Sequence, residues 1–151
     1  MDLSEADGNL RTSMLWDQLI KAPSLDDFLN QNESEIKLIP FFEYISALCK
    51  KRGECPAHVI ARAGLERSFG YQVFRGDRKP SRDTVLLLAF GFKADVALTQ
   101  SLLKRAGHSA LYPRVRRDVV IAYSLRSGIC LADTQSTLAD LGLPAIGVMP
   151  R

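Results

Sequence analysis

Apolar side chains recur along this chain at the three- and four-residue spacing of amphipathic helices, and proline, glycine or a short polar stretch separates the runs. The clearest run lies between Pro40 and Gly53, where apolar residues fall at relative positions i, i+1, i+4, i+7 and i+8. Its last residues are basic, which favours the carboxyl end of a helix, and Gly53 suits the residue that ends it. By the same reasoning, Gly91 is expected to end a helix at 82–90. The whole pattern predicts helices at residues 12–21, 25–29, 40–52, 56–63, 66–75, 82–90, 94–106, 114–126 and 131–141.

One segment of the pattern, Val119–Leu125 (VVIAYSL), also has the composition of a buried β-strand. We favour a helix there, because the interval between Pro113 and Gly128 suits the length of a helix better than that of a strand. The chain is therefore predicted to be all-α. In its last helix, the residues expected to face inward are Leu131, Leu138 and Leu141.

The chain is expected to divide into an acidic N-terminal arm (residues 1–39), a central helical domain (40–107) and a C-terminal helical extension (108–151). In the arm, residues 1–10 are small, acidic and without a period, which predicts disorder, and residues 30–34 form a polar linker. The apolar stripes of the arm fit two roles. The arm either packs on the rest of the chain or docks on another protein or a second copy.

The two ends of the chain carry opposite charge. Residues 1–35 contain eight acids and two bases, a net charge of −6, whereas residues 36–151 contain nine acids and eighteen bases, a net charge of +9. The basic part indicates a polyanionic partner, and a merely solvated charged surface is the alternative.

Composition also bears on the compartment. No apolar run approaches the roughly 20 residues that a membrane helix needs, and the acidic N-terminus lacks the apolar stretch of a signal peptide. The three cysteines (Cys49, Cys55 and Cys130) are scattered and form no CxxC pair. We therefore expect a cytoplasmic protein without membrane association, disulfide framework or zinc site.

The most specific motif lies in residues 53–80. Pro56 suits the first turn of a helix, and Gly64 and Gly76 stand where helix ends need left-handed residues. Helix-start and helix-stop residues in this order are typical of a helix-turn-helix unit. The segment resembles the lambda-repressor-like (Cro/CI, or XRE) helix-turn-helix family, over about residues 41–106, at Gly53, Ala63, Gly64, Leu65, Gly76, Arg78 and Pro80.

The resemblance implies a five-helix helix-turn-helix core, here followed by a two-helix extension, in a DNA-binding transcriptional regulator. The recognition helix, about Glu66–Arg75, would enter the major groove of double-stranded DNA. One such helix covers few bases, so a homodimer is expected. The residues expected to contact DNA are Arg67, Ser68, Tyr71, Gln72, Arg75, Arg78, Lys79 and Arg82. The first four would reach base edges, and the last four would contact phosphates.

The same region also fits a protein-interaction adaptor that retains the helix-turn-helix fold without sequence-specific DNA binding. This chain departs from the family at three places. Where the family often has a Gln that holds a phosphate, this chain has Pro56, and where the family has an apolar β-branched residue, it has Gly70. Phe69 and Tyr71 stand where the family usually has small polar residues. Glycine inside a helix costs about 1 kcal/mol relative to alanine, so Gly70 indicates either a close backbone approach or a changed helix. In this alternative, a protein partner would bind through the arm or through Phe69 and Tyr71.

Catalysis is not indicated by any motif. The sequence contains no GxSxG, HExxH, P-loop or GxGxxG pattern, so we predict neither an enzyme nor a cofactor. His58 is expected to be exposed or to face a phosphate, and His108 to lie in a loop. Cys55 is favoured as an inert thiol over a reactive one at a helix N-terminus.

Overall fold

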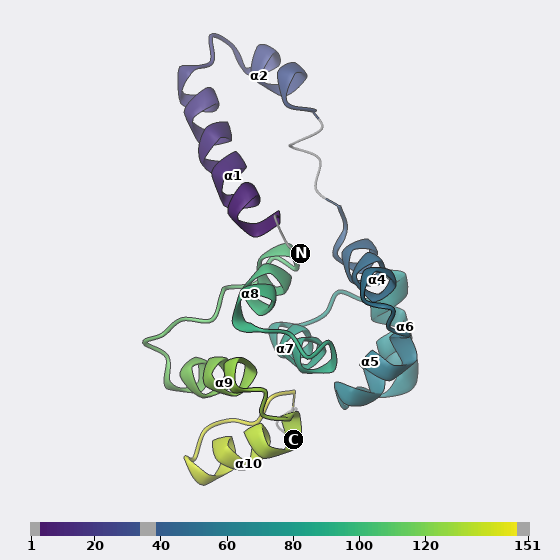
Figure 1. Ribbon diagram of the computed structural model, residues 1–151. Helices are drawn as coiled ribbons and strands as arrows, with labels where there is room; N and C mark the ends of the chain where they lie inside the picture. The colour runs from purple at the N-terminus through teal and green to yellow at the C-terminus, as the bar shows by residue number, and fades with distance from the viewer. Residues whose placement is uncertain (1–3, 34–38, 148–151) are drawn as a thin grey trace. The chain divides into compact units, whose positions relative to one another are not determined.

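A computed structural model describes the backbone of residues 4–33 and 39–147, with side chains from Thr12 onward in those ranges. Every regular element in these ranges is an α-helix, which confirms the all-α class and places Val119–Leu125 in a helix. The helices are α1 (Ser4–Lys21), α2 (Leu25–Gln31), α4 (Phe41–Arg52), α5 (Pro56–Arg62), α6 (Arg67–Arg75), α7 (Arg82–Gly91), α8 (Val96–Arg105), α9 (Arg116–Ser127) and α10 (Leu131–Asp140) (Figure 1).

The chain divides into two compact units, residues 1–38 (the N-terminal unit) and 39–151 (the body). In the N-terminal unit, Ser24 caps α2 as its sequence suggests, because its hydroxyl accepts a hydrogen bond from the Asp27 N–H at 3.1 Å. Asn32 ends this helix, and its side-chain amide donates to the Phe28 carbonyl at 3.0 Å.

Two expectations for the N-terminal unit were wrong. Residues 4–10 are helical, because α1 begins at Ser4. Likewise, α2 continues to Gln31, so the polar linker cannot begin at residue 30. The rest of the expected linker, from residue 34, lies outside the described residues, as do residues 1–3 of the expected disordered end.

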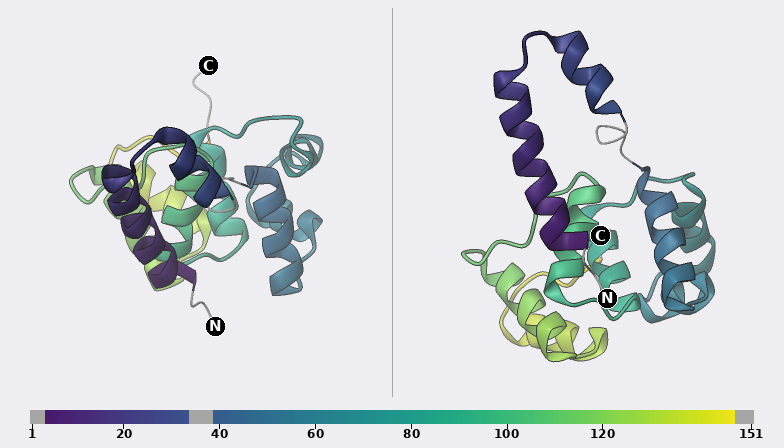
Figure 2. Two further views of the ribbon diagram at one scale, coloured as in Figure 1. Left: turned by 90° about the horizontal axis from the view of Figure 1, so that it is seen from above. Right: turned by 45° about the horizontal axis from the view of Figure 1, so that its top comes forward.

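The core of the body is built around α7, in which every residue from Thr84 to Gly91 is buried. Its N-cap is Ser81, whose hydroxyl accepts a hydrogen bond from the Thr84 N–H at 3.2 Å. Helix α7 packs against both α5 and α8. Helices α4–α6 lie on one side of α7, and α9 pairs with α10 on the other side (Figures 1 and 2).

Two glycines set the spacing of the helices around α5. A Cβ atom added to Gly91 of α7 would lie 2.5 Å from the Val59 carbonyl oxygen, and one added to Gly70 of α6 would lie 2.5 Å from Ile60 Cγ2. Gly70 therefore serves close helix packing. Helix α7 ends at Gly91 as expected, but Gly91 is itself helical, and the left-handed residue that follows is Lys93, whose φ is +54°.

One side-chain amide fastens the C-terminal extension to α8, and a second fastens the last described residues of the extension to α10. Gln100 donates to the Leu111 carbonyl at 2.9 Å and accepts from the Leu111 N–H at 2.7 Å. Gln135 pairs with Ile146 in the same two-way manner, at 2.8 Å in each direction. In α10 itself, Leu138 is fully buried as expected, but Leu141 is exposed, so its inward placement was wrong. Leu141 is the C-cap residue of α10, and the helical periodicity no longer fixes its direction there.

Candidate nucleic-acid interface

Helices α5 and α6 are joined by a tight turn centred on Gly64. This glycine has a φ of +69°, a left-handed value that side chains disfavour. The Leu65 N–H donates to the Ile60 carbonyl at 3.2 Å, which closes the end of α5. Leu65 packs against the core, and Ala63 is fully buried. The turn therefore fixes the direction in which α6 leaves α5.

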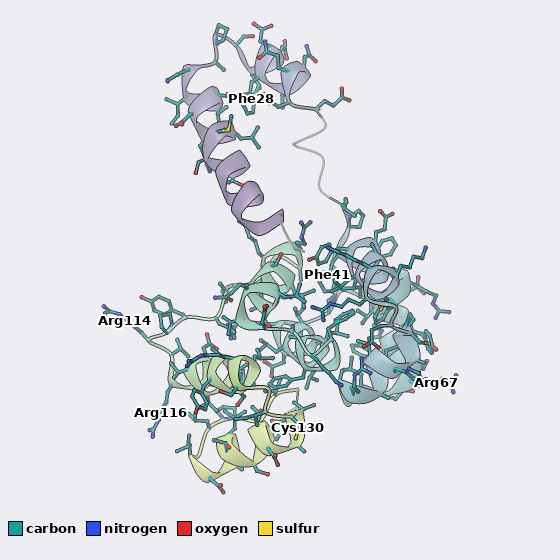
Figure 3. All side chains as sticks on the ribbon, viewed as in Figure 1. Phe28, Phe41, Arg67, Arg114, Arg116 and Cys130 are labelled. Carbon is teal, nitrogen blue, oxygen red and sulfur yellow. The ribbon has the colours of Figure 1, made fainter. Side chains whose placement is uncertain are left out.

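Helix α6 has one buried and one exposed face. Gly70, Val73 and Phe74 are buried, whereas Arg67 and Ser68 are exposed at the first turn. The side chain of Arg67 projects outward from the body (Figure 3). The amino-terminal part of α6 is thus accessible to a large partner.

Glu66 caps α6 with its own carboxylate. The side chain accepts hydrogen bonds from the Phe69 N–H at 2.8 Å and from the Ser68 N–H at 3.0 Å. These two bonds lower the pKa of Glu66, so the group is anionic at neutral pH. The N-terminus of α6 already holds a negative charge, and these backbone donors are not available to a phosphate.

Two arginines lie over aromatic rings on the outer side of α6. The Arg67 guanidinium lies 5.8 Å from the centre of the Tyr71 ring, and that of Arg78 lies 5.8 Å from the centre of the Phe69 ring. Both rings are half-buried against the core. Arg78 also donates from Nε to the Gln72 side-chain oxygen at 2.9 Å. These contacts hold Arg78 against α6 and occupy the side-chain oxygen of Gln72.

The loop after α6 carries further cationic side chains. Arg75 and Lys79 are exposed, and Arg75 forms an exposed ion pair with Asp77 at 3.4 Å. Such an exposed pair is weak and can exchange for another anion. The loop begins at Gly76, which has a φ of +83° and lies against the ring of Phe42. Helix α6 and its loop thus bring together Arg67, Ser68, Tyr71, Gln72, Arg75, Arg78 and Lys79, which we call the α6 face.

Arg82 is engaged elsewhere. Its guanidinium donates to both carboxylate oxygens of Asp118, at 3.2 and 2.9 Å, and to the carbonyls of Ser109 and Ala110. Asp118 is buried and also accepts from the Tyr112 N–H at 3.0 Å. Arg82 therefore joins α7 to the C-terminal extension, and we leave it out of the α6 face. Its partner is 36 positions away, so no local pattern could have revealed this use.

The histidines and the cysteines Cys49 and Cys55 are not part of the α6 face. His58 is exposed as expected, and Nε2 of His108 lies 2.8 Å from the Pro80 carbonyl oxygen. Cys55 is exposed at the N-cap of α5, whereas burial raises the pKa of the Cys49 thiol to about 11. Within residues 12–33 and 39–147, no three His, Cys, Asp or Glu side chains lie together as a metal site would require.

Among the described helices, none is both long enough and apolar enough to cross a membrane. No known protein-family model, curated protein or solved structure matches the chain. The sequence motif and the geometry of the α6 face are therefore the observations that bear on its function.

Proposed function

We propose that the body contains a lambda-repressor-like helix-turn-helix core and that the chain is a DNA-binding transcriptional regulator. The observation that carries this proposal is the α5–turn–α6 unit, with Gly64 in the left-handed conformation and an exposed first turn on the second helix. A helix presented in this way fits the major groove, and its first residues reach base edges.

Different residues of the α6 face bind different parts of the DNA. Arg67 and Ser68 stand at the exposed first turn, where they meet base edges. Arg75, Arg78 and Lys79 follow at the end of α6 and in its loop, and contact phosphates on either side of the groove. Because one recognition helix covers few base pairs, the regulator binds as a homodimer to two half-sites.

One observation favours a second candidate, a protein-interaction adaptor. Phe69 and Tyr71 lie beneath the guanidinium groups of Arg78 and Arg67, so the outer side of α6 is a mixed aromatic and arginine surface. Aromatic residues and arginine are enriched at protein–protein interfaces. The Glu66 carboxylate also stands at the N-terminus of α6 and repels phosphates.

A titration separates these two functions. Wild type, Arg67→Ala and Arg78→Ala are titrated against random and selected duplexes at several salt concentrations, by fluorescence anisotropy. For a DNA-binding regulator, Arg78→Ala lowers the slope of log affinity against log salt by about one for every duplex. Arg67→Ala instead costs about 1–3 kcal/mol on the selected site only.

Arg114→Ala is the matched control, because Arg114 is an exposed arginine that projects from the opposite side of the body to Arg67 (Figure 3). It leaves both the affinity and the salt slope unchanged. If no duplex binds in a salt-dependent manner, and Phe69→Ala or Tyr71→Ala releases a protein partner, the adaptor is correct.

A further inference from the structure

One face of α9 combines exposed apolar residues with arginines. Arg116, Val119, Tyr123 and Arg126 follow one another at intervals of three, four and three residues, which places them on one side of a helix. Val119 is 45% exposed and Tyr123 is 59% exposed. No described side chain forms an ion pair with Arg116 or Arg126. We call these four residues the α9 face.

The α9 face borders a shallow groove of about 260 Å³ between α9 and α10. The residues that line the groove are Val119, Val120, Tyr123, Ser124, Ile129 and Thr137. Most of this lining is apolar, and arginines lie at both ends of the α9 face. An amphipathic helix with acidic residues beside its apolar stripe is the complementary shape and charge.

The N-terminal unit supplies such a helix. In α1, Trp16 is 61% exposed and Ile20, one turn later, is 77% exposed, with the exposed Asp17 beside them. Residues 1–35 have a net charge of −6, of which α1 itself contributes −1 and the flanking residues the rest, so it is the N-terminal unit as a whole that is acidic. A unit of 38 residues rarely has enough core to be stable alone, and oligomerisation is one usual remedy.

We propose that α1 of one copy docks, through Trp16 and Ile20, in the α9–α10 groove of a second copy. The contact joins apolar surface to apolar surface and an acidic segment to the arginines of the α9 face. It is reciprocal, because each copy offers one α1 and one groove, and two such contacts close a two-fold dimer. The proposal is independent of DNA binding.

We assign α1 to a second copy because a unit of this size gains stability by oligomerisation, and because two reciprocal contacts bury twice the apolar surface of one.

Isotope mixing tests which copy supplies the helix. Full-length chains carrying the photo-cross-linker p-benzoylphenylalanine at Tyr123 are prepared with ¹⁴N and with ¹⁵N, mixed, irradiated and digested. Cross-linked peptides that join position 123 to residues 12–33 and contain one isotope from each chain are expected. Cross-links within one chain only, cross-links to another site, or no cross-links would each overturn the proposal.

Sedimentation equilibrium of full-length variants tests the energetics. Tyr123→Asp and Trp16→Asp should each raise the dimer dissociation constant by about tenfold or more, because each puts a charge into an apolar contact. Ile39→Asp is the matched control, since Ile39 is an apolar residue of similar exposure, 55%, at the start of the body. A monomeric wild type, or equal weakening by Ile39→Asp, would refute the docking.

Circular dichroism accompanies each variant. Trp16 and Tyr123 are exposed, so the helical signal of the body should remain that of wild type. A Trp16→Asp chain mixed with a Tyr123→Asp chain should form a heterodimer, because the pair retains one intact α1 and one intact groove. Failure of this mixture to associate would also count against a reciprocal contact.

Discussion

The guanidinium of Arg117 donates to both carboxylate oxygens of Asp83, at 3.0 Å each, and joins the start of α9 to the first turn of α7. The neighbouring residues repeat the arrangement in reverse, because Arg82 of α7 donates to both oxygens of Asp118 of α9. Two adjacent ion pairs of opposite direction thus lock the C-terminal extension to the central helix. The extension is an integral part of the body.

We predict that Asp118→Asn destabilises the body by about 2–3 kcal/mol, because it leaves the partly buried Arg82 without a charged partner. The measurement is urea unfolding followed by circular dichroism. Asp140→Asn is the control, since Asp140 is an exposed acid at the end of α10 and its loss should change the free energy of unfolding little. Equal effects of the two variants would show that the ion pair does not stabilise the fold.

The Asp83 pair predicts a pH dependence. Burial by itself would raise the pKa of Asp83, but hydrogen bonds from Arg117 and from the Gly147 N–H, with the charge of Arg117, lower it overall. A carboxyl with a lowered pKa stabilises the fold above its unfolded pKa of about 4, and this contribution is lost as the pH falls through its folded pKa.

The free energy of unfolding of wild type should therefore exceed that of Asp83→Asn at about pH 6 and approach it near pH 3. Urea unfolding of both proteins across this range measures the difference. A difference that stays constant with pH would mean that the charge of Asp83 is not what stabilises the contact.

Several helix ends could be predicted from the sequence because their signals are local. Ser24 and Ser81 cap the helices that they precede, and Gly53, Gly64 and Gly76 have the positive φ that helix ends favour. Gly91 has the same local signal and a different use, which only its packing against Val59 reveals.

For the candidate site, the sequence located α6 and the exposure of Arg67, since both follow from the turn at Gly64. It could not assign Arg82 to Asp118, because that pairing depends on how distant helices pack. Nor could it show that Arg78 folds back on Phe69 and Gln72, since side-chain direction is set by the neighbouring surface.

The two packing glycines should respond differently to alanine. At Gly91, the new Cβ would meet the backbone oxygen of Val59, which cannot move without shifting α5, so we expect a loss of about 2–4 kcal/mol. This loss should persist in any background that changes only side chains.

At Gly70, the three atoms nearest to the new Cβ would all be side-chain atoms of Ile60. Ile60→Ala removes those atoms, so the double variant Gly70→Ala, Ile60→Ala should be less destabilised than the sum of its single variants, by about 1 kcal/mol or more. Urea unfolding of the single and double variants forms the thermodynamic cycle. Strict additivity would mean that Gly70 has another role than close packing.

The Glu66 cap provides the last prediction, which bears directly on the proposed function. If α6 enters a DNA groove, the carboxylate at its N-terminus faces phosphates and opposes binding. Glu66→Gln retains an oxygen that accepts hydrogen bonds and removes the charge. We therefore expect affinity for every duplex to rise by about threefold at low salt, with the gain fading as salt screens the charge.

Glu43→Gln is the matched control, since Glu43 is an exposed acid in the first turn of α4, and it should leave affinity unchanged. Anisotropy titrations of wild type and both variants at low and high salt measure the effect. Equal gains for both variants would indicate a general charge effect, and no gain for Glu66→Gln would place the N-terminus of α6 away from the DNA.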